Sequence, residues 1–249
     1  MATSEHTGHP VNAMNAEKLI AYLVDMGLEY NPVLDYIKIP ALNLRLISVN
    51  GKLQIVKDTK EAYDRATNGR EIEFGDIKKL ATRLVNALIG CGASRQTIAD
   101  AKSINIKIQG GRVGELIPIT PATTEVLSED TAKITKNISV SQQNVEFVLD
   151  NFVKLITLLD LEPLYIPNEI DLQVVTMKAK IVSMKATNSI VISVTPPYEK
   201  AMANRDKEMY KIDTGLVDIT KIIKAYCLSV LGSDSDLYKK LNGIHFKNF

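Results

Sequence analysis

The sequence has no tryptophan, and only 6% of its 249 residues are aromatic. An extensive surface for stacking bases or sugars is therefore not expected. Three histidines and two cysteines, Cys91 and Cys227, are too few to suggest a metal cluster. The net charge of +1 gives the chain as a whole no electrostatic attraction to nucleic acid or anionic lipid. We expect no cofactor and no metal-binding residues.

Long hydrophobic runs are also missing. No stretch reaches the roughly 18 consecutive apolar residues of a membrane-spanning helix, and no signal peptide opens the chain. Both cysteines fall in or just after apolar helical stretches, where a small buried residue is the favoured interpretation. With only two cysteines and no signal peptide, a reducing compartment is the default. The sequence therefore predicts a cytoplasmic protein without a membrane partner.

Catalytic motifs are absent as well: there is no HExxH, GxSxG, CxxC or Walker sequence. His6 and His9 lie in an irregular N-terminal stretch without the further ligands that a metal site needs. His245 lies in an apolar tail beside Phe246, where a packed or capping role is favoured over a catalytic base. We expect no catalytic residues, and we predict that the protein is not an enzyme.

The remaining charged candidates have structural explanations. Two carboxylate pairs lie at expected helix starts, where they complement the helix dipole: Glu71 with Glu73, and Asp234 with Asp236. Arg70 and Arg205 occupy matching positions in an internal repeat, each followed by an acid. A role in bracing the corner of a helical bundle is favoured for this pair over ligand binding.

A repeated amphipathic helix is the clearest positive feature. The stretch 76–90, DIKKLATRLVNALIG, is echoed at 218–232, DITKIIKAYCLSVLG. In both copies apolar residues recur at i, i+3, i+4, i+7, i+8, i+11 and i+12, which places one apolar stripe on a helix. Both copies end at a glycine, the residue that most easily takes a left-handed conformation after a helix.

The repeat extends beyond this helix. A shift of 135 residues aligns 30–71 with 165–206 without a gap and pairs Tyr30 with Tyr165 and Tyr63 with Tyr198. A shift of 142 then aligns the two amphipathic helices. Over these stretches 12 of 57 residues are identical, where chance gives about three or four. The sequence therefore predicts a duplication.

Residues 42–57 have two interpretations. Alternating leucines followed by Asn50-Gly51 favour a β-hairpin. The same segment carries an apolar heptad stripe, which favours a helix. In the second copy Lys185-Ala186 replace Asn50-Gly51 while the heptad persists, so the helix is favoured. Gly51 would then cost about 1 kcal/mol relative to alanine.

The resulting prediction is an all-α fold of two duplicated helical-bundle units with about four helices each. We expect a flexible arm at 1–14, a first bundle repeat at 15–112, a linker containing proline and threonine at 113–138, and a second repeat at 139–249. Ser94 is placed to cap the fourth helix of the first repeat. Pro196-Pro197 predict a break or sharp kink near 194–198, because proline lacks the helical N–H donor.

Several segments resemble a group of uncharacterised proteins common in Bacteroidota genomes. They are AEKLIAYLVDMGLEYNP, KKLATRLVNALIGCGASRQTIADAKSINIKIQG, SVSQQNVEFVLDNFVKLITLL, EPLYIPNE, MYKIDTGLVDITKIIKAY and LNGIHF. The resemblance covers most of the chain and implies tandem helical bundles. It implies no activity or active site. Asn50-Gly51 and Pro196-Pro197 depart from the group, where an Ala-rich helix is expected.

Charge placement is uneven. Residues 73–112 have net charge +4, and residues 113–171 have net charge −7. On the repeated helix Lys79, Arg83 and Asn86 lie opposite the apolar stripe. This face is either simply solvated or part of complementary surfaces that set subunit order. We therefore predict a self-associating structural scaffold, forming an oligomer or filament through its helical repeats. The alternative is a sequence-nonspecific nucleic-acid-binding protein that uses the basic helix faces.

Overall fold

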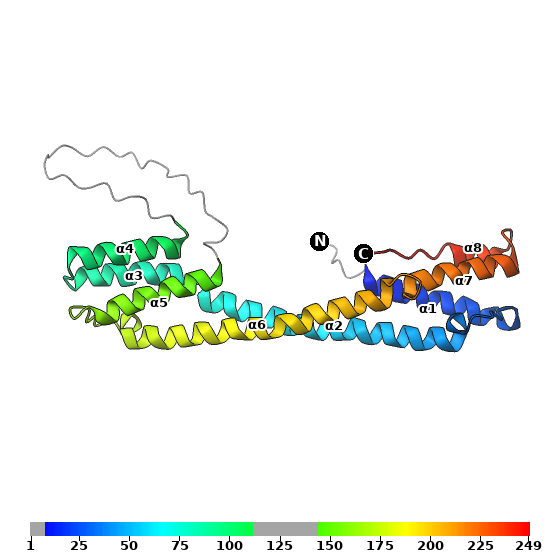
Figure 1. Cartoon of the computed structure of the whole chain (residues 1–249), viewed down its shortest axis with the longest axis horizontal. Helices are drawn as coiled ribbons and strands as arrows, with labels where there is room; N and C mark the ends of the chain where they lie inside the picture. The colour runs from blue at the N-terminus through cyan, green and yellow to red at the C-terminus, as the bar shows by residue number, and fades with distance from the viewer. Residues whose placement is uncertain (1–7, 112–143) are drawn as a thin grey trace, which may run out of the picture. The chain divides into compact units, whose positions relative to one another are not determined.

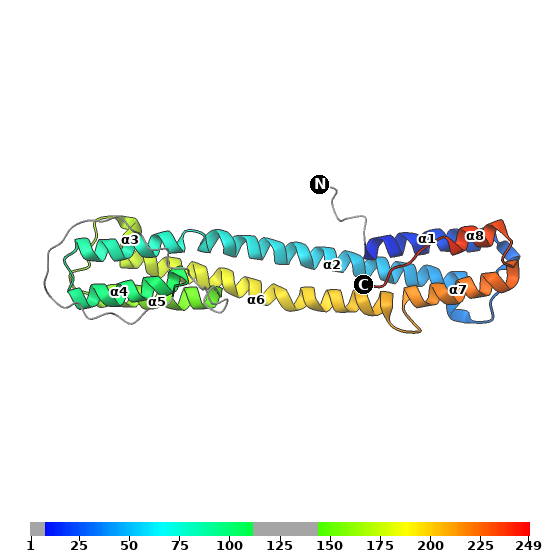
Figure 2. The same ribbon diagram turned by 90° about the horizontal axis from the view of Figure 1, so that it is seen from above.

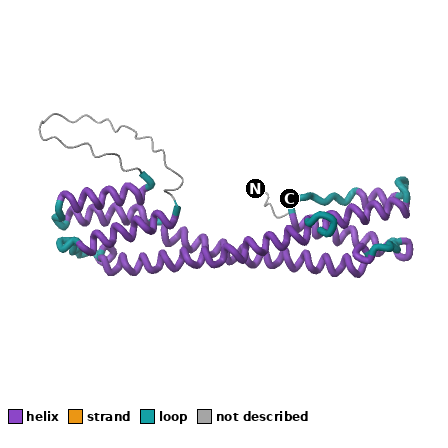
Figure 3. Tube along the Cα trace, in the orientation of Figure 1, coloured by secondary structure: helices purple, strands orange, loops and turns teal. Residues whose placement is uncertain are grey.

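The computed structural model describes residues 8–111 and 144–249. Within these residues every regular element is helical and there is no strand, which confirms the predicted all-α class (Figure 3). The predicted linker at 113–138 and His6 lie outside the described residues. The predicted arm at 1–14 is wrong for its last six residues, because helix α1 (His9–Asp25) already begins at His9. Pro10 suits the first helical turn, where no backbone N–H is needed.

The described chain forms two compact units. Unit 1 contains residues 8–66 and 192–249, and unit 2 contains residues 67–111 and 144–191. Two long helices, α2 (Ile39–Phe74) and α6 (Val174–Tyr210), each contribute residues to both units. Each unit therefore contains residues from both predicted bundle repeats, 15–112 and 139–249. The boundaries of the compact units thus differ from the boundaries of the predicted repeats. The duplication itself stays a prediction.

Unit 1 packs α1, the first part of α2 and the last part of α6 with α7 (Leu216–Leu231) and α8 (Asp236–Asn242). Figures 1 and 2 both show α7 and α8 beside α1. Two 3-10 turns, η2 (Gly27–Glu29) and η3 (Asp35–Ile37), connect α1 to α2. The largest fully buried side chains of this unit come from these helices and from η3: Leu19, Leu23, Ile37 and Leu42. Tyr63 and Tyr198, which the 135-residue shift aligns, stack with ring centroids 5.4 Å apart.

Unit 2 packs the end of α2 and the start of α6 with α3 (Ile77–Gly90), α4 (Arg95–Gln109) and α5 (Val145–Leu161). The 3-10 turn η5 (Ile170–Leu172) precedes α6. The predicted stripe of α3 forms much of the core, with these residues buried: Ile77, Ala81, Leu84, Val85 and Leu88. The helix ends at Gly90 as predicted, but the positive φ of 77° is at Gly92. Phe152 on α5 is fully buried in the same core.

Residues 42–57 are helical throughout, so the helical interpretation is confirmed and the hairpin is excluded. Leu42 and Val49, seven residues apart, are buried on one face of α2. Gly51 lies on the exposed face, where no atom would lie within 4 Å of an added Cβ. Burial of the heptad stripe therefore outweighs the local turn preference of Asn50-Gly51.

We expect Gly51→Ala to raise the free energy of unfolding by about 0.5–1 kcal/mol, because alanine loses less backbone entropy in a helix and meets no neighbour here. Urea denaturation followed by circular dichroism measures the change. Gly92→Ala is the matched control and should destabilise the protein, because its φ of 77° is strained for alanine. Equal effects of the two substitutions would contradict this account.

The predicted break at Pro196-Pro197 is wrong, because α6 continues from Val174 to Tyr210 through both prolines. Both prolines lie on the exposed side of the helix. At exposed positions a helix can bend slightly toward water, which relieves the clash of a proline ring with the preceding turn without disturbing core packing. The continuous α6 carries Met177 and Met184 into the core of unit 2, and Met209 into that of unit 1.

The fourth helices of the two halves differ in length. α4 has 15 residues, and Ser94 caps it as predicted by accepting a hydrogen bond from the Thr97 N–H at 3.1 Å. α8 has only seven residues, and its cap is Ser235. Residues 244–249 follow it without regular secondary structure. This tail, rather than a longer helix, covers α1 in unit 1.

Candidate functional site

Two connecting loops share the same internal anchor. In residues 25–38, the first apolar loop, the Tyr30 hydroxyl donates to the Ile37 carbonyl at 2.7 Å. In residues 160–173, the second apolar loop, the Tyr165 hydroxyl donates to the Leu172 carbonyl at 2.9 Å. Burial raises the pKa of Tyr165 to about 12 and raises that of Tyr30 even further, so both hydroxyls remain donors at neutral pH. Each loop is therefore held in one conformation by its own buried tyrosine.

Both loops expose large apolar side chains. Leu28 and Val33 in the first loop are 100% and 92% exposed, and Ile166 and Ile170 in the second are 78% and 74% exposed. Further exposed apolar residues lie in the same loops: Leu34, Tyr36, Leu161 and Leu164. Grouped apolar side chains of this size mark interaction sites on many proteins. These exposed loops were not predicted from the sequence, although apolar residues beside Pro32 and Pro167 are a visible signal.

The two loops differ in charge. The second loop contains four acidic residues and no basic one, whereas the first contains three acidic residues and Lys38. In the second loop Asp160 pairs with Lys178 at 2.8 Å, and Asp171 pairs with Arg83 at 2.7 Å. Both pairs are exposed, so each contributes little to stability. In the first loop Asp35 pairs with Lys38 at 2.6 Å, so two carboxylates without an ion pair to a described residue remain in each loop: Asp25 and Glu29 in the first, and Glu162 and Glu169 in the second.

In unit 1 the C-terminal tail is fixed by side chains that bind its backbone. The Asn12 amide donates to the Lys247 carbonyl at 2.6 Å and accepts from the Lys247 N–H at 3.0 Å. The Lys224 ammonium donates to the carbonyls of Asn242 and Ile244 at 3.0 and 2.5 Å. The Asn15 amide donates to the His245 carbonyl at 2.7 Å. These bonds hold a segment without regular structure against α1.

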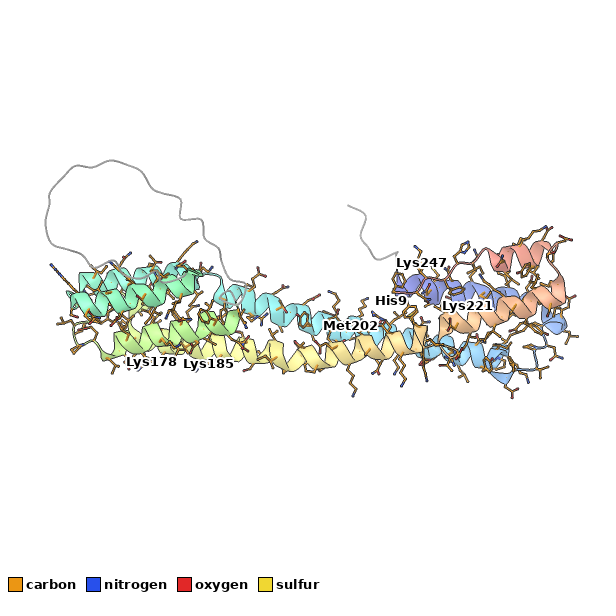
Figure 4. The ribbon with its side chains drawn as sticks, turned by 45° about the horizontal axis from the view of Figure 1, so that its top comes forward. His9, Lys178, Lys185, Met202, Lys221 and Lys247 are labelled. Carbon is orange, nitrogen blue, oxygen red and sulfur yellow. The ribbon has the colours of Figure 1, made fainter. Side chains whose placement is uncertain are left out.

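His9 belongs to an aromatic cluster at the end of this tail. Its Nδ1 lies 2.7 Å from the Tyr210 hydroxyl, and its ring centroid lies 5.0 Å from that of Phe249. Figure 4 shows His9 and Lys247 close together where α1 begins. Burial, and secondarily the charge of Arg205, lower the pKa of His9. Within residues 8–111 and 144–249, no group of three His, Cys, Asp or Glu residues could hold a metal ion.

A basic groove of about 550 Å³ opens in unit 1 between α1, α8 and the tail. Four lysines line it, and no carboxylate does: Lys18, Lys239, Lys240 and Lys247. Tyr22 and Ile244 contribute apolar wall. His245, predicted to be packed or capping, is instead exposed on this groove, because its backbone rather than its ring is bound by the bundle. The groove was not predicted from the sequence, since its lysines are far apart in the chain.

The predicted basic face on α3 is less basic than its sequence indicates. Lys79, Arg83 and Asn86 are exposed as expected. Arg83, however, pairs with Asp171, and the cavity of about 430 Å³ beside it is lined by both signs of charge, including Asp76 and Lys180. This mixture weakens the attraction of the face for a polyanion.

The other candidates have packing or pairing roles. Arg70 donates to the Asn188 side chain at 3.2 Å within unit 2, whereas Arg205 pairs with Asp206 at 2.8 Å. Cys227 is buried as predicted, and burial raises its pKa to about 11. Cys91 is half-buried against the core of unit 2. In each of the two predicted carboxylate pairs one acid forms an ion pair and the other is exposed: Glu73 pairs with Lys180 and Asp236 with Lys239, whereas Glu71 and Asp234 are exposed. Both cysteines are free thiols.

The fold and these surfaces define an all-α helical-bundle protein. No known protein-family model matches this chain, and no curated protein or solved structure matches it either. None of the helices in the described part of the chain is long and apolar enough to cross a membrane.

Proposed function

We propose that this protein is a non-enzymatic structural scaffold that self-associates into an oligomer or filament. The observation that carries the proposal is the pair of apolar loops, which expose Leu28 and Val33 in unit 1 and Ile166 and Ile170 in unit 2. Full burial of one such side chain contributes about 1.5–3 kcal/mol. Two loops per chain allow each copy to contact more than one neighbour.

The fixed conformation of the loops favours association. A loop that is already ordered loses less conformational entropy when it binds. Tyr30 and Tyr165 anchor the two loops internally, so their exposed side chains are presented before any partner arrives. A site built this way binds by shape and apolar area and needs no reacting group.

We expect the purified protein to self-associate. The double substitution Ile166→Ser/Ile170→Ser should weaken this association by about tenfold or more, because two large apolar side chains lose their buried contacts. Size-exclusion chromatography with light scattering across protein concentration measures it. Leu28→Ser/Val33→Ser tests the first loop in the same way.

The matched control is Ile72→Ser, which changes an equally exposed isoleucine outside both loops. It should leave association unchanged. A strictly monomeric wild-type protein at high concentration would refute the scaffold proposal. Negative-stain microscopy then distinguishes closed oligomers from filaments.

The alternative proposal is sequence-nonspecific binding of nucleic acid. The observation that favours it is the basic groove of unit 1, rather than the mixed face around Lys79 and Arg83. Phosphate-backbone binding of this kind weakens steeply with salt. A gel shift of a short oligonucleotide at low salt tests it, and an unchanged mobility would reject it.

The two free thiols support our further proposal of a cytoplasmic location.

A further inference from the structure

We infer that the basic groove of unit 1 receives the second apolar loop of another copy of this chain. The inference rests on the proposed self-association and names the two surfaces that meet. The groove lies between α1, α8 and the tail, and the loop spans residues 160–173 of unit 2. The contact therefore joins two different surfaces of one kind of chain.

The groove is a preformed site for an acidic partner. Four lysines line its 550 Å³ without a carboxylate among them. Lys239 is partly engaged, since its ammonium donates to the Asp234 carbonyl at 2.9 Å and lies 3.7 Å from Asp236. Lys18 and Lys240 lie on opposite walls, on α1 and α8, and both are exposed. Like charges held around one cavity are stabilised when a partner supplies opposite charge.

The walls of the groove do not depend on the partner. Asn12 and Asn15 bind the tail backbone from α1, and Lys224 binds it from α7. These bonds keep Ile244 buried and place Lys247 at the rim. The groove is thus available in the isolated chain, which lowers the entropic cost of filling it.

The second apolar loop supplies both negative charge and apolar area to this groove. Two of its four carboxylates, Asp160 and Asp171, already pair with Lys178 and Arg83. Glu162 and Glu169 have no ion pair with any described residue, so both can pair with an external lysine. Glu162 also accepts a hydrogen bond from the Leu164 N–H at 3.4 Å, which orients its carboxylate. Ile166 and Leu164 lie between them in sequence and can pack on the half-buried ring of Tyr22 in the groove wall.

A contact between two different surfaces repeats from copy to copy. Each chain has one groove and one second loop, so every copy can donate a loop and accept another. Such heterologous contacts build rings or open filaments rather than closed twofold dimers. Opposite charges on the two surfaces set the register and speed the encounter.

Paired charge reversals test the inference. Lys18→Glu/Lys240→Glu reverses the groove, and Glu162→Lys/Glu169→Lys reverses the loop. We expect each double variant alone to associate more weakly than the wild-type protein, by about tenfold or more, as measured by sedimentation velocity at low salt. A mixture of the two variants should recover association, because each reversed surface then meets its complement. Circular dichroism verifies that all variants are folded.

The matched control is Glu71→Lys/Glu199→Lys, which makes the same charge change at two exposed carboxylates outside both loops and outside the groove. It should leave association unchanged. Rescue of the groove variant by Asp25→Lys/Glu29→Lys instead of by the second-loop variant would show that the first loop fills the groove and would overturn the inference. Wild-type association that is unaffected by groove reversal would also overturn it while leaving the scaffold proposal intact. A monomeric wild type would remove both. If groove reversal instead abolishes binding of a short single-stranded oligonucleotide and leaves association unchanged, the groove binds nucleic acid and the inference is wrong.

Discussion

Replacing Phe152 with alanine is expected to lower the free energy of unfolding by about 3–5 kcal/mol. Phe152 is fully buried in the unit 2 core, where α5 packs against α3 and α4. Truncation removes the transfer free energy of the ring and leaves a cavity that the surrounding helices fill only in part. Urea denaturation followed by circular dichroism measures the loss.

Leu161→Ala is the control for this substitution. Leu161 lies at the end of the same helix but is 77% exposed. Its truncation should change the free energy of unfolding by no more than about 0.5 kcal/mol, measured at a protein concentration where the chain is monomeric. A loss below about 1 kcal/mol for Phe152→Ala would mean that α5 does not pack as described.

Replacing Asn12 with alanine is expected to destabilise unit 1 by about 1–3 kcal/mol and to release the tail. Asn12 is 1% exposed, and its amide forms two hydrogen bonds to the backbone of Lys247 and a third, at 3.3 Å, to the Tyr210 hydroxyl. Alanine offers none of these partners, so the tail backbone must turn to water or remain unpaired. Hydrogen exchange at residues 244–249 should accelerate together with the loss of stability.

Asn15→Ala separates this role from a general effect of changing α1. Asn15 makes one hydrogen bond to the tail, to the His245 carbonyl, from a half-buried position. Its loss should cost no more than about 1 kcal/mol. If tail exchange in Asn12→Ala stays at the wild-type rate, Asn12 does not hold the tail.

Regular elements with a repeating apolar pattern were predictable from sequence. The predicted apolar stripe on α3 is buried in the structure. It could be predicted because the spacing of apolar residues within one helix shows which face packs on the core. The prediction of a helix at 42–57 was correct. It relied on the aligned segment of the second half, which lacks Asn50-Gly51 but keeps the apolar heptad. The break at Pro196-Pro197 was wrong because local rules omit exposure, which lets a helix continue where water is accessible. The resemblance to Bacteroidota proteins stays a prediction.

The candidate surfaces were mostly not predictable, for reasons of distance along the chain. Asn12 and Lys247 are 235 residues apart, and no periodicity joins an asparagine to a backbone carbonyl so far away. The basic groove combines lysines from α1, α8 and the tail, whereas the sequence pattern indicated a basic surface on α3. The apolar loops were overlooked because hydrophobicity alone does not tell an exposed leucine from a buried one.

The way that the chain passes between the units also fixes the order in which they can form during synthesis. Unit 2 is one continuous stretch of chain, whereas unit 1 is assembled from an early segment and a late one. Folding on the ribosome proceeds from the N-terminus. The described residues of unit 2, 67–111 and 144–191, can therefore complete their contacts while α1 and the first part of α2 still lack α7, α8 and the tail. The apolar faces of α1 and α2 are the surfaces that a nascent chain must keep from aggregating until α7, α8 and the tail have been synthesised.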